Sequence, residues 1–255
     1  YAESRIPGAR HAVLERDLSA PVQPGVTGRH PLPDREFLAA RLAALGVGRN
    51  AQVVAYDAAA GPMAARLWWL LRWLGHEAVA VLDGGFAGWI AAGLPLERTT
   101  PSAPASTGDL RSGPSLVSSV DLERVAAGGL RLLDARERAR FAGEQEPIDP
   151  VAGRIPGALN HPFTDNLDAD GRFLPPSALR ERFAASLGGA EEGAASSGTD
   201  GALVHYCGSG VTAAHNVLAM THAGLEPGAL YPGSYSEWIT RHTPERDADP
   251  SFRDA

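Results

Sequence analysis

Cysteine is almost absent from this sequence of 255 residues, which holds a single one, Cys207. One cysteine cannot form an internal disulfide, and a zinc site built on cysteine ligands would need more of them. A basic excess is also lacking, because the net charge is −7 and the isoelectric point is about 5.6; this argues against nucleic-acid binding. No apolar run approaches the roughly 18 residues of a membrane span. We therefore expect a monomeric cytoplasmic protein with neither nucleic acid nor membrane as a partner.

What the sequence does contain is an internal repeat, the first feature to look for in any chain. The first shared segment is R-I-P-G-A, at Arg5–Ala9 and again 149 residues later at Arg154–Ala158. A second pair of segments, L-D-G-G-F-A-G-W and Y-P-G-S-Y-S-E-W, has the same offset. Between them, V-V-A-Y-D at Val53–Asp57 matches L-V-H-Y-C at Leu203–Cys207. The common order and spacing indicate two homologous domains, with Asp in the first copy where the second has Cys.

The repeat predicts an N-terminal domain at 1–98 and a C-terminal domain at 115–255, joined by a Pro- and Ser-rich linker at 99–114. A Gly-rich stretch at 188–201 is expected to be an exposed loop. In the second copy L-R-L-L-D-A-R, at 130–136, precedes R-I-P-G-A, whereas the first copy has only four residues before its own. We expect that the first domain lacks its first strand here and that the native protein extends further toward the N-terminus.

The secondary structure is expected to alternate. Short apolar runs at Leu130–Leu133 and Leu203–Tyr206 are typical of buried parallel strands. Apolar residues at helical spacing predict helices at Ala64–Leu74 and Thr212–Ala223. This alternation predicts the α/β class, with a mainly parallel sheet flanked by helices in each domain.

Cys207 is the candidate nucleophile. An apolar strand precedes it, and G-S-G and then a helix follow it, which places the cysteine at the carboxyl end of a strand, where reactive groups of α/β sheets gather. The glycines allow several backbone N–H groups to point inward, and together with the helix dipole these stabilise an anion such as the thiolate. A buried cysteine that only fills space would not need a glycine-rich loop behind it.

Three chemistries use a cysteine in such a loop. A cysteine phosphatase needs an arginine six residues after the cysteine to bind the phosphate, and that position is Ala213. A cysteine hydrolase needs a histidine base, and the neighbouring candidate, His205, is expected on a face directed to the core. Sulfur transfer remains, in which the thiolate attacks a sulfur atom and carries it as a persulfide.

The chain resembles the rhodanese-type sulfurtransferases. The resemblance covers nearly the whole sequence and rests on two domains, an active loop only in the second, G-R-I-P-G-A before it, and Y-C-G-S-G-V-T-A. Thiosulfate sulfurtransferases of this family tend to carry a cation after the cysteine, whereas 3-mercaptopyruvate sulfurtransferases carry C-G-S-G-V-T, the form present here. The resemblance therefore implies a 3-mercaptopyruvate donor, which has one carboxylate and needs a guanidinium to bind it.

The resemblance also implies a proton-handling set. In the mercaptopyruvate enzymes a loop serine works with a histidine and an acid from the N-terminal domain, and these fall on Ser209, His30 and Glu15. Asp17 is close enough to Glu15 to be the acid instead. Such a set can activate the thiol or protonate the departing enolate. Because it draws on both domains, a site in the cleft between them is expected.

The family uses an arginine in a segment that reads E-R-A-R-F here. We therefore expect Arg140, rather than its neighbours Arg136 and Arg138, to bind the carboxylate of the substrate. Many mercaptopyruvate enzymes have a second arginine nine residues further on. This chain has Asp149 there, with Arg154 as a possible substitute. This departure concerns the binding of the substrate carboxylate and leaves the sulfur chemistry unaffected.

We therefore predict a sulfurtransferase that moves sulfur from 3-mercaptopyruvate to thioredoxin, a small thiol or cyanide, with no metal or organic cofactor. The persulfide on Cys207 would be stabilised by loop N–H groups, those of Gly208, Ser209, Gly210, Val211 and Thr212. One alternative is thiosulfate sulfurtransfer. Another is a persulfide carrier or binding module, which would keep Cys207 without needing the Ser209, His30 and Glu15 set.

Overall fold

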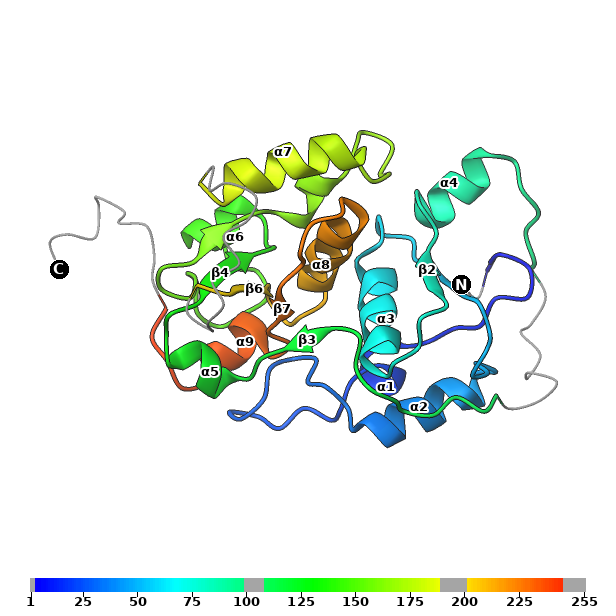
Figure 1. Cartoon of the computed structure of the whole chain (residues 1–255), viewed down its shortest axis with the longest axis horizontal. Coiled ribbons are helices and arrows are strands. Elements are labelled where there is room, and N and C mark those ends of the chain that lie inside the picture. Colours follow the sequence, from blue (N-terminus) through cyan, green and yellow to red (C-terminus); the bar gives the residue numbers. More distant parts are fainter. Residues whose placement is uncertain (1–2, 99–107, 189–200, 245–255) are drawn as a thin grey trace, which may run out of the picture. The chain divides into compact units, whose positions relative to one another are not determined.

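The structure is a computed structural model that describes residues 3–98, 108–188 and 201–244 (Figure 1). The chain divides into two compact units that exchange short segments of the sequence. Unit 1 comprises Tyr1–Val22, His30–Ser118 and Leu167–Leu174, and unit 2 comprises Gln23–Arg29, Ser119–Asn166 and Pro175–Ala255.

Unit 1 is built around a pair of parallel strands, β1 (Val53–Ala55) and β2 (Val79–Val81). The long helix α3 (Pro62–Trp73) packs against both strands and buries its apolar face, which includes the fully buried Trp69. The other helices of the unit are α1 (Leu14–Asp17), α2 (Arg35–Ala44) and α4 (Gly85–Ala91). The described part of unit 1 therefore shows a strand–helix–strand unit with short helices around it.

Unit 2 holds a five-stranded sheet in the order β3-β7-β6-β4-β5. The strands are β3 (Ser118–Ser119), β4 (Arg131–Asp134), β5 (Leu159–Asn160), β6 (Leu203–Tyr206) and β7 (Ala229–Leu230). The pairs β4–β5, β4–β6 and β6–β7 are all parallel. Leu132 and Val204, on the central strands β4 and β6, belong to its buried core.

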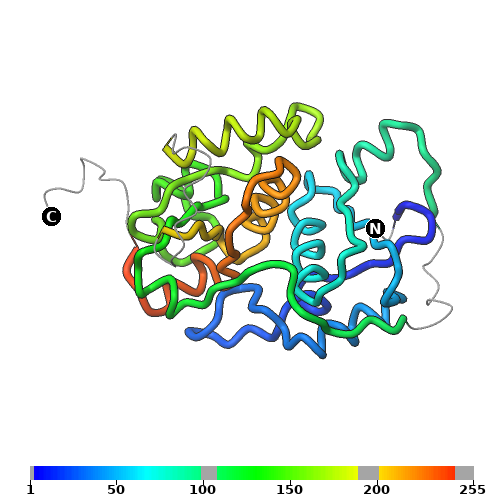
Figure 2. The backbone as a smooth tube through the Cα atoms, in the orientation of Figure 1, coloured from blue at the N-terminus to red at the C-terminus, as the bar shows by residue number. Residues whose placement is uncertain are grey.

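Helices connect the strands of unit 2. Helix α8 packs against β6 and β7, and α7 packs on α8; Figure 2 traces the same path as a tube. The bounds are α5 (Leu122–Ala126), α6 (Arg138–Ala142), the 3-10 helix η1 (Phe163–Asn166), α7 (Pro176–Ser186), α8 (Thr212–His222) and α9 (Ser234–Trp238). The α/β class and the parallel sheet are confirmed, as are the strands predicted around Leu130–Leu133 and at Leu203–Tyr206 and both predicted helices.

The repeated I-P-G-A segment forms the same turn in both copies. The N–H of Ala9 donates to Ile6 O at 3.1 Å, and the N–H of Ala158 donates to Ile155 O at 3.2 Å. The glycines at the third position have φ values of +75° and +73°. Proline followed by a glycine with positive φ is the signature of a type II turn, so this segment has a structural role.

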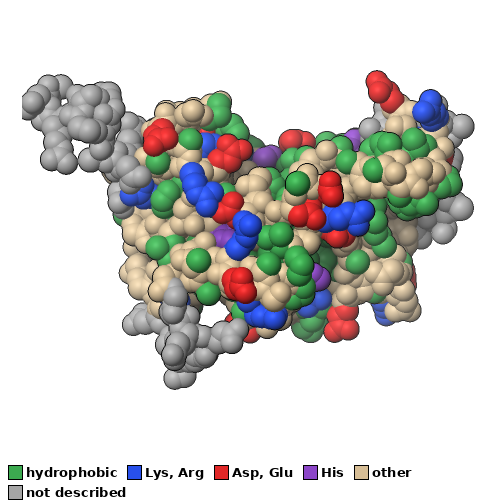
Figure 3. Space-filling view, turned by 90° about the horizontal axis from the view of Figure 1, so that it is seen from above, with side chains coloured by type: hydrophobic (Ala, Val, Ile, Leu, Met, Phe, Trp, Pro, Cys, Tyr) green, Lys and Arg blue, Asp and Glu red, His purple; other side chains and the backbone are tan. Residues whose placement is uncertain are grey.

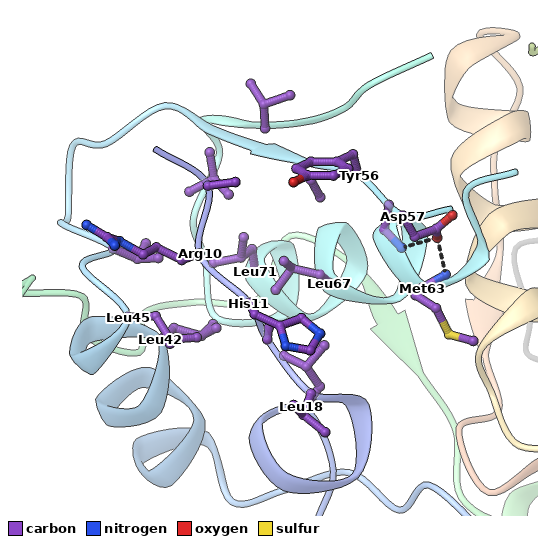
Figure 4. A pocket seen from close by; sticks show the side chains of 18 of the residues that line it. Arg10, His11, Leu18, Leu42, Leu45, Tyr56, Asp57, Met63, Leu67 and Leu71 are labelled. Carbon is purple, nitrogen blue, oxygen red and sulfur yellow. Dashed lines mark hydrogen bonds between the residues drawn. The ribbon is translucent and has the colours of Figure 1, made fainter. Parts of the chain in front are cut away.

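Unit 1 contains a cavity of about 690 Å³ (Figure 4). Strand β1 lines it on one side and Arg10–Val13 on another, with Leu67 and Leu71 of α3 also facing it. By the offset of 149 residues, Arg10 and His11 correspond to β5 of unit 2, and in unit 2 strand β4 lies between β6 and β5. The cavity thus lies where β4 would stand in the second copy. The expectation that the first domain lacks a strand stays a prediction.

The predicted linker and loop lie partly outside the described residues. Of the linker at 99–114, the described part bonds to unit 1: the N–H of Gly108 donates to Ala43 O at 2.7 Å, and that of Gly113 donates to Leu74 O at 2.7 Å. Of the loop expected at 188–201, residues 189–200 lie outside the described residues.

The described surface carries charges of both signs. In Figure 3 the arginine side chains lie interspersed with aspartate and glutamate on the visible face. No helix in the described ranges has the length and apolar character that crossing a bilayer requires.

Candidate active site

Cys207 directly follows β6, at the carboxyl end of the strand. The side chain is buried, and its Sγ accepts a hydrogen bond of 3.1 Å from the N–H of Gly210. Gly210 has a φ of +76°, a conformation that glycine adopts without steric cost. This glycine therefore bends the loop so that a backbone donor points back at the sulfur, immediately before α8 begins at Thr212.

The loop is fixed from behind by the start of α9. The N–H of Cys207 donates to Ser234 Oγ at 3.1 Å, and Cys207 O accepts from the N–H of Tyr235 at 2.9 Å. Gly208 O accepts from the N–H of Ser236 at 2.9 Å. Ser234 itself has a φ of +56°, a strained conformation for a residue with a side chain. The strain is retained at the point where its hydroxyl accepts the hydrogen bond from the Cys207 N–H.

The matching loop of the first copy shows which ligand this backbone suits. There the carboxylate of Asp57 accepts four hydrogen bonds from the backbone, at 2.8 Å from Ala59, 2.9 Å from Gly61, 2.8 Å from Met63 and 2.9 Å from Ala64. Figure 4 shows the Asp57 side chain with the bond to Met63. A ring of inward N–H groups at a helix N-terminus is an anion site. The Cys207 loop is the homologous segment of the second copy, and there the N–H of Gly210 points at the cysteine sulfur.

Arg140 lies on α6 and points a guanidinium toward this loop. Its Nε and Nη2 bond to Glu146, the shortest contact being 2.7 Å, and Nη2 also donates to Asp149 Oδ2 at 3.1 Å. Its Nη1 bonds to none of the described residues and lies 3.7 Å from the position that a Cβ on Gly208 would take. Arg140 is therefore anchored by two carboxylates and keeps one edge toward the active loop.

A second guanidinium, that of Arg29, reaches the same place. Its Nη2 lies 2.6 Å from the Cβ position of Gly208, and its Nη1 forms an ion pair with Asp149. Burial, and next the positive charge of Arg140, lower the pKa of Arg29, while the charge of the Cys207 thiolate opposes that change. Two guanidinium groups thus lie over Gly208, the residue after Cys207.

Sequence reasoning missed Arg29. The signal that could have found it is its place in G-R-H-P-L-P, directly before the candidate His30. Its position in unit 2 depends on close backbone packing: the N–H of Arg29 donates to Ser236 Oγ at 3.1 Å, and a Cβ on Gly28 would collide with Gly233 O. Glycine at 28 is what allows the Arg29 segment to approach the start of α9.

The neighbouring arginines have other partners. Arg136 is buried and binds Asp134 through Nε and Nη2, the latter at 2.7 Å. Although burial alone would lower it, the adjacent Asp134 raises the pKa of Arg136. Arg138 is exposed and pairs with Asp165 at 2.7 Å. Arg154, the suggested substitute, stacks on the ring of Phe141 at 4.7 Å. Of the arginines after β4 that the sequence offered, Arg140 faces Gly208.

The predicted acid and histidine belong to unit 1. His30 Nε2 lies 3.9 Å from Glu15 Oε1. The alternative acid, Asp17, is fully buried and binds Arg16 and Arg41. Burial raises its pKa, but hydrogen bonds from Arg16, Val13 N–H and Arg41 outweigh this and lower the pKa of Asp17 well below its usual range. Within this unit Glu15 is the acid near His30. Their role beside Cys207 remains a prediction.

The remaining candidates lie in or next to the loop. Ser209 and Val211 are buried, and Thr212 is the first residue of α8. His205 is fully buried within β6, and burial lowers its pKa to about 3. This supports the expectation that His205 faces the core. Among the described residues, no group of three His, Cys, Asp or Glu side chains is placed to hold a metal ion.

Comparison with known proteins gives the family. The rhodanese-like domain matches the chain twice, at residues 1–92 and 121–241. The chain belongs to the rhodanese family. The chain is 53% identical to a probable 3-mercaptopyruvate sulfurtransferase of Pseudomonas aeruginosa. The alignment spans 245 residues and covers 94% of this chain and 83% of that protein. The chain is 39% identical to the putative thiosulfate sulfurtransferase SseB of Mycobacterium tuberculosis, over 95% and 83% of the two chains.

A solved structure agrees with these relatives. The crystal structure of SseA from Escherichia coli, a 3-mercaptopyruvate sulfotransferase, matches this chain with a TM-score of 0.75 and 32% sequence identity. The match covers 93% of this chain and 85% of SseA. The prediction of two rhodanese-type domains is confirmed, and the chain is a sulfurtransferase enzyme.

Proposed function

We propose that this protein transfers sulfur from 3-mercaptopyruvate through a persulfide on Cys207. The observation that carries the proposal is the pair of guanidinium edges, from Arg29 and Arg140, over Gly208. A carboxylate bound there would hold the substrate sulfur beside Cys207 Sγ. The relative of Pseudomonas aeruginosa, a probable 3-mercaptopyruvate sulfurtransferase at 53% identity, supports the same donor.

The first half-reaction forms one bond and breaks one. The Cys207 thiolate attacks the substrate sulfur, an S–S bond forms, and the C–S bond breaks with its electron pair moving onto the carbon skeleton as the enolate of pyruvate. A proton then converts the enolate to pyruvate. The terminal sulfur of the persulfide carries the negative charge. The N–H of Gly210 and the neighbouring N–H groups of the loop stabilise that charge.

We assign the proton to Ser209, His30 and Glu15. The 3.9 Å separation of His30 and Glu15 within unit 1 supports the histidine–acid part of this set. In the second half-reaction an acceptor thiolate attacks the outer sulfur of the persulfide. The S–S bond to Cys207 breaks, the outer sulfur stays on the acceptor, and the Cys207 thiolate is restored. The acceptor is thioredoxin, a small thiol or cyanide. The reaction uses no metal or organic cofactor.

The test is a comparison of kcat/KM for 3-mercaptopyruvate and for thiosulfate with one acceptor, using Cys207→Ser as the blank. A preference for 3-mercaptopyruvate of about a hundredfold, or ~2.7 kcal/mol of transition-state discrimination, is expected. Arg140→Gln and Arg29→Gln should each raise KM for 3-mercaptopyruvate, whereas Arg138→Gln, which removes an exposed arginine of the same helix as Arg140, should not. A wild-type preference for thiosulfate would overturn the proposal.

Thiosulfate sulfurtransfer is the second candidate. Two arginines beside the nucleophile favour a dianion as well as a monoanion, and the relative SseB is a putative thiosulfate sulfurtransferase. The same kinetic comparison decides between them.

A persulfide carrier without turnover is distinguished by His30→Asn. In an enzyme this change lowers kcat, whereas a carrier would still accept sulfur on Cys207 at an unchanged rate.

A further inference from the structure

Asp149 stands where many mercaptopyruvate enzymes have an arginine, and its position in the structure is specific. The side chain is 1% exposed and bridges both site arginines, with Oδ1 bound to Arg29 and Oδ2 at 3.1 Å from Arg140 Nη2. Its backbone N–H donates to Glu146 at 2.9 Å. The aspartate is therefore built into the anion-binding side of the site.

The bridge changes the charge of the site. Two guanidinium groups, those of Arg29 and Arg140, lie over Gly208, and a third, that of Arg136, shares Glu146 with Arg140. Three buried carboxylates pair with these groups: Asp134, Glu146 and Asp149. The pairs balance in formal charge. Although two arginines face Gly208, the site as a whole has no cationic excess with which to attract a second negative charge.

We propose that Asp149 is a specificity-determining residue that makes this site select monoanionic sulfur donors over dianionic ones. The inference rests on the proposed function, because it explains how a site with two arginines prefers a single carboxylate. Asp149 acts through Arg29 and Arg140: it holds their spacing and cancels one positive charge beside the nucleophile. A monoanionic donor can be bound by the N–H edges of Arg29 and Arg140 alone. A dianion such as thiosulfate would bind more tightly for each positive charge that no carboxylate neutralises, because charges interact strongly in a buried site.

The test uses Asp149→Asn, which keeps the shape and one acceptor oxygen but removes the charge. The first half-reaction is measured in single turnovers, by release of pyruvate from 3-mercaptopyruvate and of sulfite from thiosulfate, so that no acceptor enters the comparison. We expect the ratio of kcat/KM for thiosulfate to that for 3-mercaptopyruvate to rise about tenfold or more over wild type. The thiosulfate reaction of the variant should also fall more steeply with added salt than that of wild type.

Two further variants separate charge from shape. Asp149→Glu keeps the charge and should restore a ratio near that of wild type even if both rates fall. Asp165→Asn removes a carboxylate that pairs with exposed Arg138, and it should leave the ratio unchanged. If Asp149 only positions the arginines, Asp149→Asn would lower both rates together.

An unchanged ratio in Asp149→Asn, within about threefold, would overturn the inference. The proposed function fails on a different result, a wild-type preference for thiosulfate, and the shift in ratio caused by Asp149→Asn is measurable in either case.

Discussion

Gly208 is the residue at which the side chains of Arg29 and Arg140 meet the loop after Cys207. A Cβ there would lie 2.6 Å from Arg29 Nη2 and 3.6 Å from Arg140 Nη2. Because Gly208 has no side chain, the guanidinium of Arg29 can occupy this space. This also gives a physical reason for C-G-S-G in this chain, since a side chain at 208 would compete with Arg29 for one position.

Gly208→Ala should move Arg29 away from the loop while leaving the fold intact, because the atom it meets is the end of a long side chain. We expect KM for 3-mercaptopyruvate to rise about tenfold, the loss of one charge-assisted hydrogen bond, with kcat changed less than about threefold. Gly48→Ala is the control, because a Cβ there meets nothing closer than 3.5 Å. Equal KM values for Gly208→Ala and wild type would show that Arg29 does not bind substrate.

At the scale of elements, the two strand–loop–helix segments share a backbone design and differ in the group they hold. After β1 the loop encloses the carboxylate of Asp57 with four N–H donors, and after β6 it encloses a sulfur. The first loop is closed by its own side chain, so it has no place for a substrate anion. This explains in structural terms why only the second copy is expected to react.

Asp57→Ala should leave those four donors without their acceptor. We expect the free energy of unfolding of unit 1 to fall by about 2–3 kcal/mol, with the sulfur-transfer rate unchanged where the variant is folded. Urea titration checks this. Asp83→Ala is the matched control, because within the described residues its carboxylate accepts one hydrogen bond, from the N–H of Phe173. A cost no larger than that of Asp83→Ala would contradict the argument.

The sequence predicted these elements well because each has a local cause. The glycines around Cys207 and the apolar run of Leu203–Tyr206 act within a few residues, and the repeat supplied each element twice. Arg29 was missed because its place depends on contacts distant in sequence: Ser236 holds its backbone, and Asp149 binds its side chain. Asp149 was noted only as a departure, since its two partners come together only in the folded chain.

In the whole molecule, the division into units also depends on contacts between residues distant in sequence, which the sequence alone does not reveal. The repeat predicts two consecutive domains, but Gln23–Arg29 belongs to unit 2 and Leu167–Leu174 to unit 1. A repeat is a linear pattern, and it cannot predict that a short segment leaves its own copy. One of these segments carries Arg29, the residue that we propose binds the substrate carboxylate.

Stability should depend on pH through the buried histidines. Burial lowers the pKa of His205 to about 3 and also lowers that of His161. Near pH 6.5 and below, the unfolded chain binds protons that the folded chain does not, so stability is full above pH 6.5 and is lost as pH falls toward 3. His205 alone should cost ~1.4 kcal/mol between pH 7.5 and 5.5.

Urea unfolding of wild type and His205→Leu at these two pH values measures that contribution. The variant should lose less stability than wild type on acidification, by about the amount given for one histidine. His222→Gln, which removes an exposed histidine at the end of α8, should retain the dependence of wild type. Parallel curves for wild type and His205→Leu would contradict the assignment.

The loop around Asp57 has a consequence for oxidative damage to Cys207. A cysteine sulfinate has two oxygens on one atom and a negative charge, as a carboxylate does, and a homologous backbone already holds a carboxylate with four N–H groups. Two equivalents of peroxide convert the thiolate to the sulfinate and two waters, a step that thiols do not reverse. The backbone that we propose stabilises the persulfide should therefore also stabilise the sulfinate form of the enzyme. Peroxide given without a sulfur donor should add ~32 Da to Cys207 that dithiothreitol does not remove, whereas a persulfide of the same nominal mass is removed.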